Sequence, residues 1–231
     1  MDQSDRTENS DLRVEKMLRL RTAALILGWL RVTTALMGST SGARGLVMSS
    51  RVSLGAGCYW GTEKFIKKDF QTIVPSSIKS GAVGFMNPSP NAPPNPSYRD
   101  VCSGRTGYVE TYDLEYDGNP KTFEQLVRFF FSFHDPTTQD RQGNDRGTQY
   151  ASVIFTYDQE QAVIAERVKG EVQALIDAGT IKKYEGRKVT TAIIPATKFY
   201  AAQAEHQEYL AKNPFGYCNH GFRFQVKDVF K

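Results

Sequence analysis

The sequence has few of the residues that build metal centres and disulfide scaffolds. It contains three cysteines and three histidines in 231 residues. Three scattered cysteines are too few for the disulfide framework of a small secreted domain. A structural zinc site needs ligands paired at tight spacing, such as Cys-x-x-Cys, and the sequence has no such pair. We therefore expect no metal site, and thiol chemistry suits these cysteines better.

The sequence also lacks a strong charge of either sign. The formal net charge is +4, and residues 1–50 contribute seven basic and five acidic side chains to it. Residues 51–231 therefore carry only about +2, with no stripe of basic residues interleaved with aromatics. This pattern argues against nucleic acid as the main partner. We also find no internal repeat.

No apolar run near the N-terminus is long enough to span a membrane. Residues 23–30 are apolar, but this run is too short for a bilayer and is interrupted by Arg31. Arg19 and Arg21 precede the run, and the small residues 41–43 follow it. Basic residues, a short apolar stretch and a small-x-small site are the order found in removable targeting peptides.

We therefore predict a disordered or removable leader over residues 1–50, with a possible targeting segment around residues 17–45. An exposed amphipathic helix, or translation from a later start at Met48, would account for the same residues. The leader favours a cytoplasmic or organellar location, in a mitochondrion or plastid, without choosing between them. Residues 51–231 are predicted to form a single catalytic domain, with no membrane interaction.

Strand and helix patterns alternate through this domain. The expected class is α/β, or more closely an α+β two-layer fold with a ferredoxin-like mixed or antiparallel sheet, packed helices and a mobile C-terminal tail. Strands are predicted at 51–54, 77–85, 109–116, 151–157 and 188–194. Helices are predicted after Cys58, from a capping box of Thr122 with Gln125, from Asp158 with Gln161 to Gly179, and over 198–210.

Cys58 follows Gly55-Ala56-Gly57 where a predicted strand turns into a helix. At a helix N-terminus the free N–H groups and the helix dipole favour a thiolate, so we expect the thiol pKa to be lowered. Tyr59 and Trp60 beside it offer an apolar wall for a small group such as an S-methyl. The alternative is that Cys58 is a buried, inert, small hydrophobic residue, as most free cysteines are.

The surrounding motif resembles a known family. Residues 57–63, Gly-Cys-Tyr-Trp-Gly-Thr-Glu, are similar to the signature Gly-Cys-Phe-Trp-Gly-x-Glu of methionine sulfoxide reductase A. Two departures are Tyr59, where the family usually has phenylalanine, and the loop 84–88, where many relatives have a Gly-Tyr-x-Gly-Gly-like turn. Further similar blocks, which extend the resemblance from Val52 to Cys218, are Pro96–Glu110, His134–Pro136, Gln142–Tyr150, Glu205–Gln207, Tyr209-Leu210 and Asn213-Pro214.

This resemblance implies an oxidoreductase that reduces protein-bound and free methionine S-sulfoxide to methionine, and so repairs oxidised proteins. It implies that the thiolate of Cys58 attacks the sulfoxide sulfur and becomes a sulfenic acid. It also implies a set of polar and aromatic residues around the sulfoxide. These are Glu110, Tyr98 and Tyr150 as catalytic residues, with Tyr59, Trp60 and Asp145 as substrate-binding residues.

The strand pattern around Glu110 gives independent support for its role. Glu110 shares a strand face with Tyr112, Leu114 and Tyr116. Burial on this apolar face raises a carboxyl pKa, and a proton retained near neutrality is what a general acid needs. The alternative is a glutamate at the end of the strand that reaches solvent.

A sulfenic acid on Cys58 would condense with a second thiol. Cys218 is the favoured resolving residue because it lies in a glycine-bearing tail that resembles the family's resolving segment. Cys102, near Tyr98, is the competitor. An external dithiol protein, for which we expect thioredoxin, would then reduce the resulting disulfide by thiol–disulfide exchange. We expect no other cofactor. Two other functions stay open at this point: a cysteine peroxidase-type enzyme, and a non-enzymatic thiol redox sensor.

Overall fold

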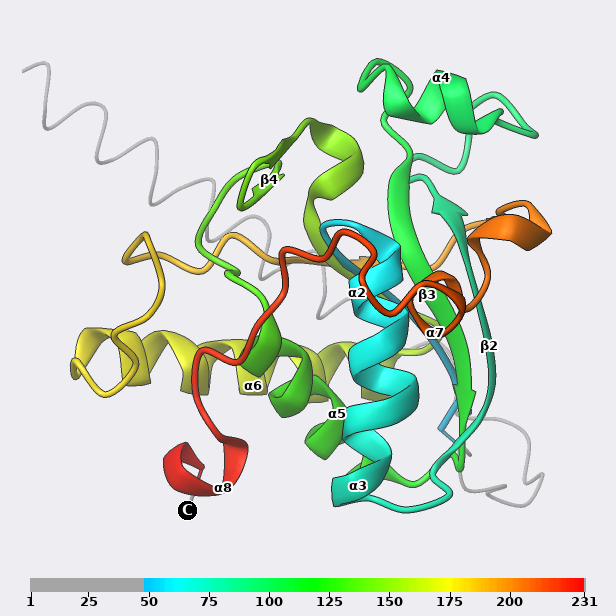
Figure 1. Cartoon of the computed structure of the whole chain (residues 1–231). Coiled ribbons are helices and arrows are strands. Elements are labelled where there is room, and N and C mark those ends of the chain that lie inside the picture. The colour runs from blue at the N-terminus through cyan, green and yellow to red at the C-terminus, as the bar shows by residue number, and fades with distance from the viewer. Residues whose placement is uncertain (1–47, 231) are drawn as a thin grey trace, which may run out of the picture. The chain divides into compact units, whose positions relative to one another are not determined.

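The computed structural model describes residues 48–230 (Figure 1). The predicted leader, including the targeting segment around 17–45, lies almost entirely outside these residues, so the leader, the domain division and the location stay predictions. No helix within residues 48–230 has both the length and the apolarity needed to cross a membrane.

The domain is built on one six-stranded sheet. Its strand order is β7-β6-β1-β3-β2-β8, antiparallel throughout except for the parallel pair β6 and β7. The four inner strands, β6-β1-β3-β2, have the order of a ferredoxin-like fold, which confirms the expected class. The strands are β1 (Arg51–Ala56), β2 (Ile78–Met86), β3 (Val109–Tyr116), β6 (Ser152–Thr156), β7 (Ala192–Pro195) and β8 (Phe199–Ala201).

Helices cover one face of this sheet (Figure 1). The first begins after Cys58 as α2 and continues through a π-helical segment, η1, into α3. The helical elements are α2 (Tyr59–Lys64), η1 (Phe65–Phe70), α3 (Gln71–Ile73), α4 (Tyr98–Cys102), α5 (Pro120–Phe133), η2 (Thr148–Tyr150), α6 (Gln159–Asp177), η3 (Ala204–His206), α7 (Tyr209–Lys212) and α8 (Val226–Val229). A separate two-stranded ribbon pairs β4 (Arg141–Gln142) with β5 (Asp145–Arg146).

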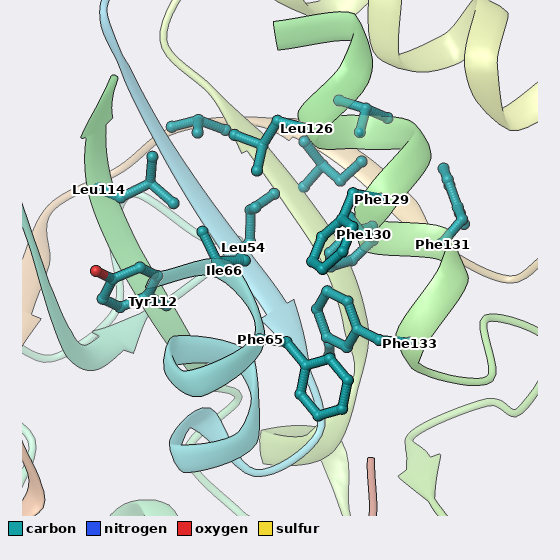
Figure 2. Packing of buried hydrophobic residues seen from close by; sticks show 14 of the residues in the cluster. Leu54, Phe65, Ile66, Tyr112, Leu114, Leu126, Phe129, Phe130, Phe131 and Phe133 are labelled. Atoms are coloured by element: carbon teal, nitrogen blue, oxygen red, sulfur yellow. The ribbon is translucent and has the colours of Figure 1, made fainter. Parts of the chain in front are cut away.

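The main core lies between the sheet and α5 (Figure 2). Leu54 of β1 and Leu114 of β3 face the helices, together with fully buried phenylalanines of α5. Burial of each such side chain contributes about 1.5–3 kcal/mol. The opposite sheet face has a smaller cluster of Met86, Val109, Val153 and Phe155. This division gives β3 one face on the main core and one on the minor cluster.

The capping patterns in the sequence predicted the start of α6 correctly but misplaced the start of α5. Asp158 caps α6, because its side chain accepts a hydrogen bond from the Gln161 backbone N–H, as predicted. The capping box of Thr122 with Gln125 is wrong. The helix begins earlier, with Asn119 as its N-cap, and the Thr122 hydroxyl donates instead to Asp117 at 2.9 Å.

The predicted helix over 198–210 is also wrong. This segment begins as the edge strand β8, which pairs with β2, and becomes helical only in η3 and α7. The Gln207 side chain accepts from the Val83 N–H at 2.8 Å and donates to the Val83 carbonyl at 2.9 Å. These bonds to β2 replace the local bonds of a helix. The strand predicted from residue 188 starts only at Ala192, because Thr190 donates its N–H to Pro136 instead.

Candidate active site

Cys58 lies at the turn between β1 and α2, as the sequence predicted. Gly57 has a φ of +92°, which favours glycine. A Cβ atom added at Gly57 would also lie 2.5 Å from the Cβ of Gln142, so this position has no room for a side chain. The turn therefore requires glycine for its conformation and for its packing, and it directs Cys58 to the start of the helix.

The electrostatic environment of Cys58 differs from the expectation. The side chain is only 7% exposed, and this burial raises the thiol pKa well above its ordinary value. The charge of Glu110 adds to the rise, and a hydrogen bond from the Trp60 backbone N–H offsets part of it. The predicted lowering by the helix N-terminus is therefore wrong in sign, since desolvation outweighs it. Burial therefore favours the neutral thiol form of Cys58.

Glu110 is the buried carboxyl of the site. It is 2% exposed on the main-core face of β3, as predicted. Among the described residues its hydrogen-bond partner is the Tyr59 backbone N–H, at 3.1 Å from Oε2. Burial raises its pKa to about 8, and the nearby charge of Asp145 adds to the rise. Glu110 is therefore protonated at neutral pH and can donate a proton.

Aromatic rings pack beside this turn. Tyr59 is 1% exposed, and its ring centroid lies 5.9 Å from that of Phe85. Trp60 stacks on Tyr209 at 3.8 Å and on His206 at 5.8 Å. The ring of His206 also lies 4.5 Å from that of Tyr98. The predicted aromatic wall of Tyr59 and Trp60 is thus part of a larger aromatic cluster.

The three other predicted polar residues come from separate elements. Tyr98 begins α4 and Tyr150 ends η2. The pKa of the Tyr150 hydroxyl is raised by burial and by charges that include Glu110, Asp145 and Cys58, so these groups lie near one another. The Asp145 carboxylate accepts hydrogen bonds from two residues of the C-terminal tail, Tyr217 and Asn219. Asp145 therefore fastens the tail, which the sequence did not indicate.

The two candidate resolving cysteines occupy different environments. Cys102 is exposed, at the end of α4, and its thiol lies near the Tyr98 hydroxyl, one turn earlier on the same helix. Cys218 is half-buried, packs against the core cluster that includes Cys58, and is among the groups whose charge raises the Cys58 pKa. This geometry favours Cys218 as the thiol beside Cys58.

Two motif residues have structural rather than chemical contacts. Glu63 is 4% exposed and accepts a hydrogen bond from the Glu208 N–H at 2.8 Å, which secures the start of α7. His134 is fully buried, contacts the Phe130 carbonyl and the Ser152 hydroxyl, and has a pKa lowered by burial to about 3. Within residues 48–230, no three His, Cys, Asp or Glu side chains are grouped to hold a metal ion.

The sequence analysis assigned no role to three residues that lie at this site. His206 and Tyr209 complete the aromatic cluster around Trp60. His220 contacts Cys218 and the end of β1, with its Nδ1 3.8 Å from the Cys218 sulfur. The short spacing between Cys218 and His220 was a usable signal, but the sequence analysis assigned a role only to Cys218.

Comparisons with known proteins show which family the chain belongs to. The family model described as peptide methionine sulfoxide reductase matches residues 50–231. A probable peptide methionine sulfoxide reductase of Schizosaccharomyces pombe is 40% identical over 175 residues, which cover 75% of this chain and 96% of the relative. The peptide methionine sulfoxide reductase MsrA of Vibrio cholerae is 42% identical over 172 residues, 74% of each protein.

Two solved structures are also similar. Reduced Mxr1 from Saccharomyces cerevisiae has a TM-score of 0.63 and 35% identity, and the match covers 77% of this chain and 93% of that one. Methionine sulfoxide reductase A of Corynebacterium diphtheriae has a TM-score of 0.57 and 38% identity, with coverage of 76% and 80%. From its buried thiol, its protonated carboxyl and these matches, we conclude that the chain belongs to the peptide methionine sulfoxide reductase family.

Proposed function

We propose that Cys58 and Glu110 together carry out the reduction of methionine S-sulfoxide, free or within oxidised proteins and peptides. The observation that carries the proposal is the neutral, buried Glu110 carboxyl, bonded to the backbone N–H of the residue after Cys58. A sulfoxide sulfur is a poor electrophile until its oxygen is protonated or hydrogen-bonded. A carboxyl that keeps its proton at neutral pH, next to a thiol, supplies that activation.

In the first step the Cys58 sulfur attacks the sulfoxide sulfur while Glu110 donates its proton to the oxygen. The Cys58 thiol gives up its proton as it attacks, and Glu110 is the acceptor that restores the carboxyl. The sulfur–sulfur bond formed by this attack and the sulfur–oxygen bond of the substrate both break as the oxygen becomes bonded to the Cys58 sulfur as a hydroxyl. The products are methionine and a sulfenic acid on Cys58, so the substrate sulfur is reduced and the cysteine sulfur is oxidised.

The remaining site residues orient the substrate. The hydroxyls of Tyr98 and Tyr150, both with raised pKa values, stay protonated and donate hydrogen bonds to the sulfoxide oxygen. Tyr59 and Trp60 supply the apolar surface for the S-methyl group. Asp145, the third substrate-binding residue, acts through the tail segment that it holds by bonds to Tyr217 and Asn219.

In the second step the Cys218 thiol attacks the Cys58 sulfenic acid. A disulfide forms between the two sulfurs, and the hydroxyl leaves with the thiol proton as water. Thioredoxin, a dithiol protein, then reduces this disulfide by exchange and restores both thiols. Cys218 is half-buried and its charge acts on Cys58, whereas Cys102 is exposed, and this supports the assignment of Cys218 over Cys102.

The nucleophile is tested with Cys58→Ser, assayed with resolved methionine sulfoxide epimers and dithiothreitol as reductant. We expect turnover of the S epimer to fall by about 10⁴-fold or more, while the matched variant Cys102→Ser keeps activity. A peroxidase or a redox sensor would give no multiple turnovers on methionine sulfoxide. Activity that persists in Cys58→Ser would overturn the proposal.

The resolving residue is tested with Cys218→Ser under two reductants. With thioredoxin we expect multiple turnovers to be lost, because no intramolecular disulfide forms for exchange. With dithiothreitol, which reduces a sulfenic acid directly, turnover should continue. Loss of thioredoxin-dependent turnover in Cys102→Ser instead would reassign the resolving step to Cys102.

A further inference from the structure

His220 connects the tail that contains Cys218 to the strand that leads to Cys58. Its Nε2 lies 2.7 Å from the Ala56 carbonyl oxygen, two residues before Cys58. A carbonyl oxygen only accepts, so Nε2 carries the ring proton and donates it. The other nitrogen, Nδ1, is then an acceptor. It lies 3.8 Å from the Cys218 sulfur, so the thiol donates its hydrogen to it.

The fold makes room for this ring at Gly61. A Cβ atom added there would lie 2.0 Å from the His220 Nδ1, so no other residue fits beneath the imidazole. Gly61 belongs to α2, the helix that begins directly after Cys58. Phe65 and Phe133 contact other sides of the ring, with centroid distances of 6.1 and 5.7 Å. The imidazole is therefore held in one orientation against the catalytic helix.

Backbone and side-chain bonds on both sides of His220 hold the rest of the tail. Before it, Asn219 donates to the Gln142 carbonyl at 2.6 Å and to Asp145 at 2.7 Å. After it, the Gly221 N–H donates to the Phe133 carbonyl at 3.0 Å. The segment is thus placed beside Cys58 while all three cysteines are free.

We propose that His220 is the positioning residue of the resolving step, holding the Cys218 thiol by its hydrogen so that the sulfur faces Cys58. This inference rests on the proposed role of Cys218. When Cys58 carries a sulfenic acid, the Cys218 sulfur forms the new sulfur–sulfur bond and the Cys58 sulfur–oxygen bond breaks. The thiol proton, hydrogen-bonded at Nδ1, leaves with the hydroxyl as water, and His220 stays neutral throughout.

The charge state of the ring supports this role. Burial lowers the pKa of His220 to about 4, and the positive charges of Arg223 and Lys64 add to the effect. The imidazole is therefore neutral at physiological pH, and Nδ1 keeps the free lone pair that accepts the thiol hydrogen. A protonated ring would donate from both nitrogens and would not hold the thiol in this way.

The test separates the two chemical steps in one experiment. Reduced enzyme receives one equivalent of methionine S-sulfoxide without reductant and is quenched at intervals with a thiol-alkylating reagent. Mass spectrometry measures methionine, which reports the first step and an intact fold, and the Cys58–Cys218 disulfide, which reports resolution. In His220→Gln the amide N–H can still reach Ala56, but once it does so the side chain has no acceptor at the position of Nδ1 beside Cys218.

For His220→Gln we expect the rate of disulfide formation, relative to methionine formation, to fall about 10- to 100-fold, as for a reacting group displaced by about 1 Å. Gly61→Ala should lower the same ratio, because its methyl group displaces the imidazole. Gly170→Ala is the matched control, since a Cβ there meets no atom within 4 Å, and it should leave the ratio unchanged. An unchanged ratio in both His220→Gln and Gly61→Ala would overturn the inference, whereas a wild-type enzyme without this disulfide would overturn the role of Cys218 itself.

Discussion

Strand β3 has a buried carboxyl on each face, and the two have very different hydrogen-bond partners. Asp113 is 6% exposed, receives two hydrogen bonds from Arg51, at 2.9 and 2.6 Å, and a third from the Tyr157 hydroxyl at 2.8 Å. Glu110 is 2% exposed and bonded to one backbone N–H. Burial raises both pKa values, but only Asp113 has a cation that offsets the rise.

The comparison teaches that partners, more than burial, decide what a buried carboxyl does. Asp113 accepts hydrogen bonds from Arg51 and Tyr157 and therefore stabilises the fold as part of an ion pair. Glu110 has no cationic partner, and its pKa of about 8 makes it an acid at neutral pH. A carboxyl with few partners reduces stability and gains proton-donating capacity, as expected at a functional site.

The largest predicted effect is the opposite response of these two residues to amide substitution. Glu110→Gln should lower kcat/KM by about 10²–10⁴-fold, since the amide has no proton to donate. Asp113→Asn should leave kcat/KM unchanged and lower the free energy of unfolding by about 1–3 kcal/mol, since the Arg51 pair is lost. Steady-state kinetics and denaturant unfolding measure both. Equal effects of the two variants on kcat/KM would contradict the comparison.

The pH dependence gives a second, intermediate prediction. The protonated form of Glu110 is the active one, so kcat/KM should be level below pH 8 and fall by about tenfold per unit above it. Because the folded-state pKa is raised, the unfolded chain releases this proton first. Glu110 therefore lowers stability increasingly as pH rises from about 4 to 8. Glu110→Gln should remove both trends, as pH–rate profiles and unfolding measured at several pH values will show.

The smallest predicted effect compares two buried tyrosines. The Tyr59 hydroxyl is buried without a partner among the described residues, whereas the Tyr116 hydroxyl donates to the Ser49 carbonyl at 2.7 Å. Tyr59→Phe should therefore raise the free energy of unfolding, and Tyr116→Phe should lower it, each by about 1 kcal/mol. Thermal or denaturant unfolding measures the sign. A loss of stability in Tyr59→Phe would show that its hydroxyl has a partner after all.

Sequence patterns predicted the parts of this site that depend on local signals. The alternation over 109–116 fixed the face of Glu110, and the glycines before Cys58 located the turn. The other features depend on contacts between residues far apart in the sequence, and the patterns did not predict them. Backbone pairing with β2 makes residues 199–201 an edge strand, where a helix was predicted. Burial reversed the predicted direction of the Cys58 pKa. The role of His220 depends on contacts with Ala56 and Gly61, more than 150 residues earlier.

The central claim is that Cys58 takes the oxygen from the sulfoxide. Its most direct test uses reduced Cys218→Ser protein, in which the sulfenic acid cannot be resolved, mixed with one equivalent of methionine S-sulfoxide. A sulfenic acid-trapping reagent and peptide mass spectrometry then locate the oxidised residue. The account predicts one trapped sulfenic acid on the peptide that contains Cys58 for each methionine formed. Methionine formed while Cys58 stays a free thiol, or with the oxygen on Cys102, would contradict it.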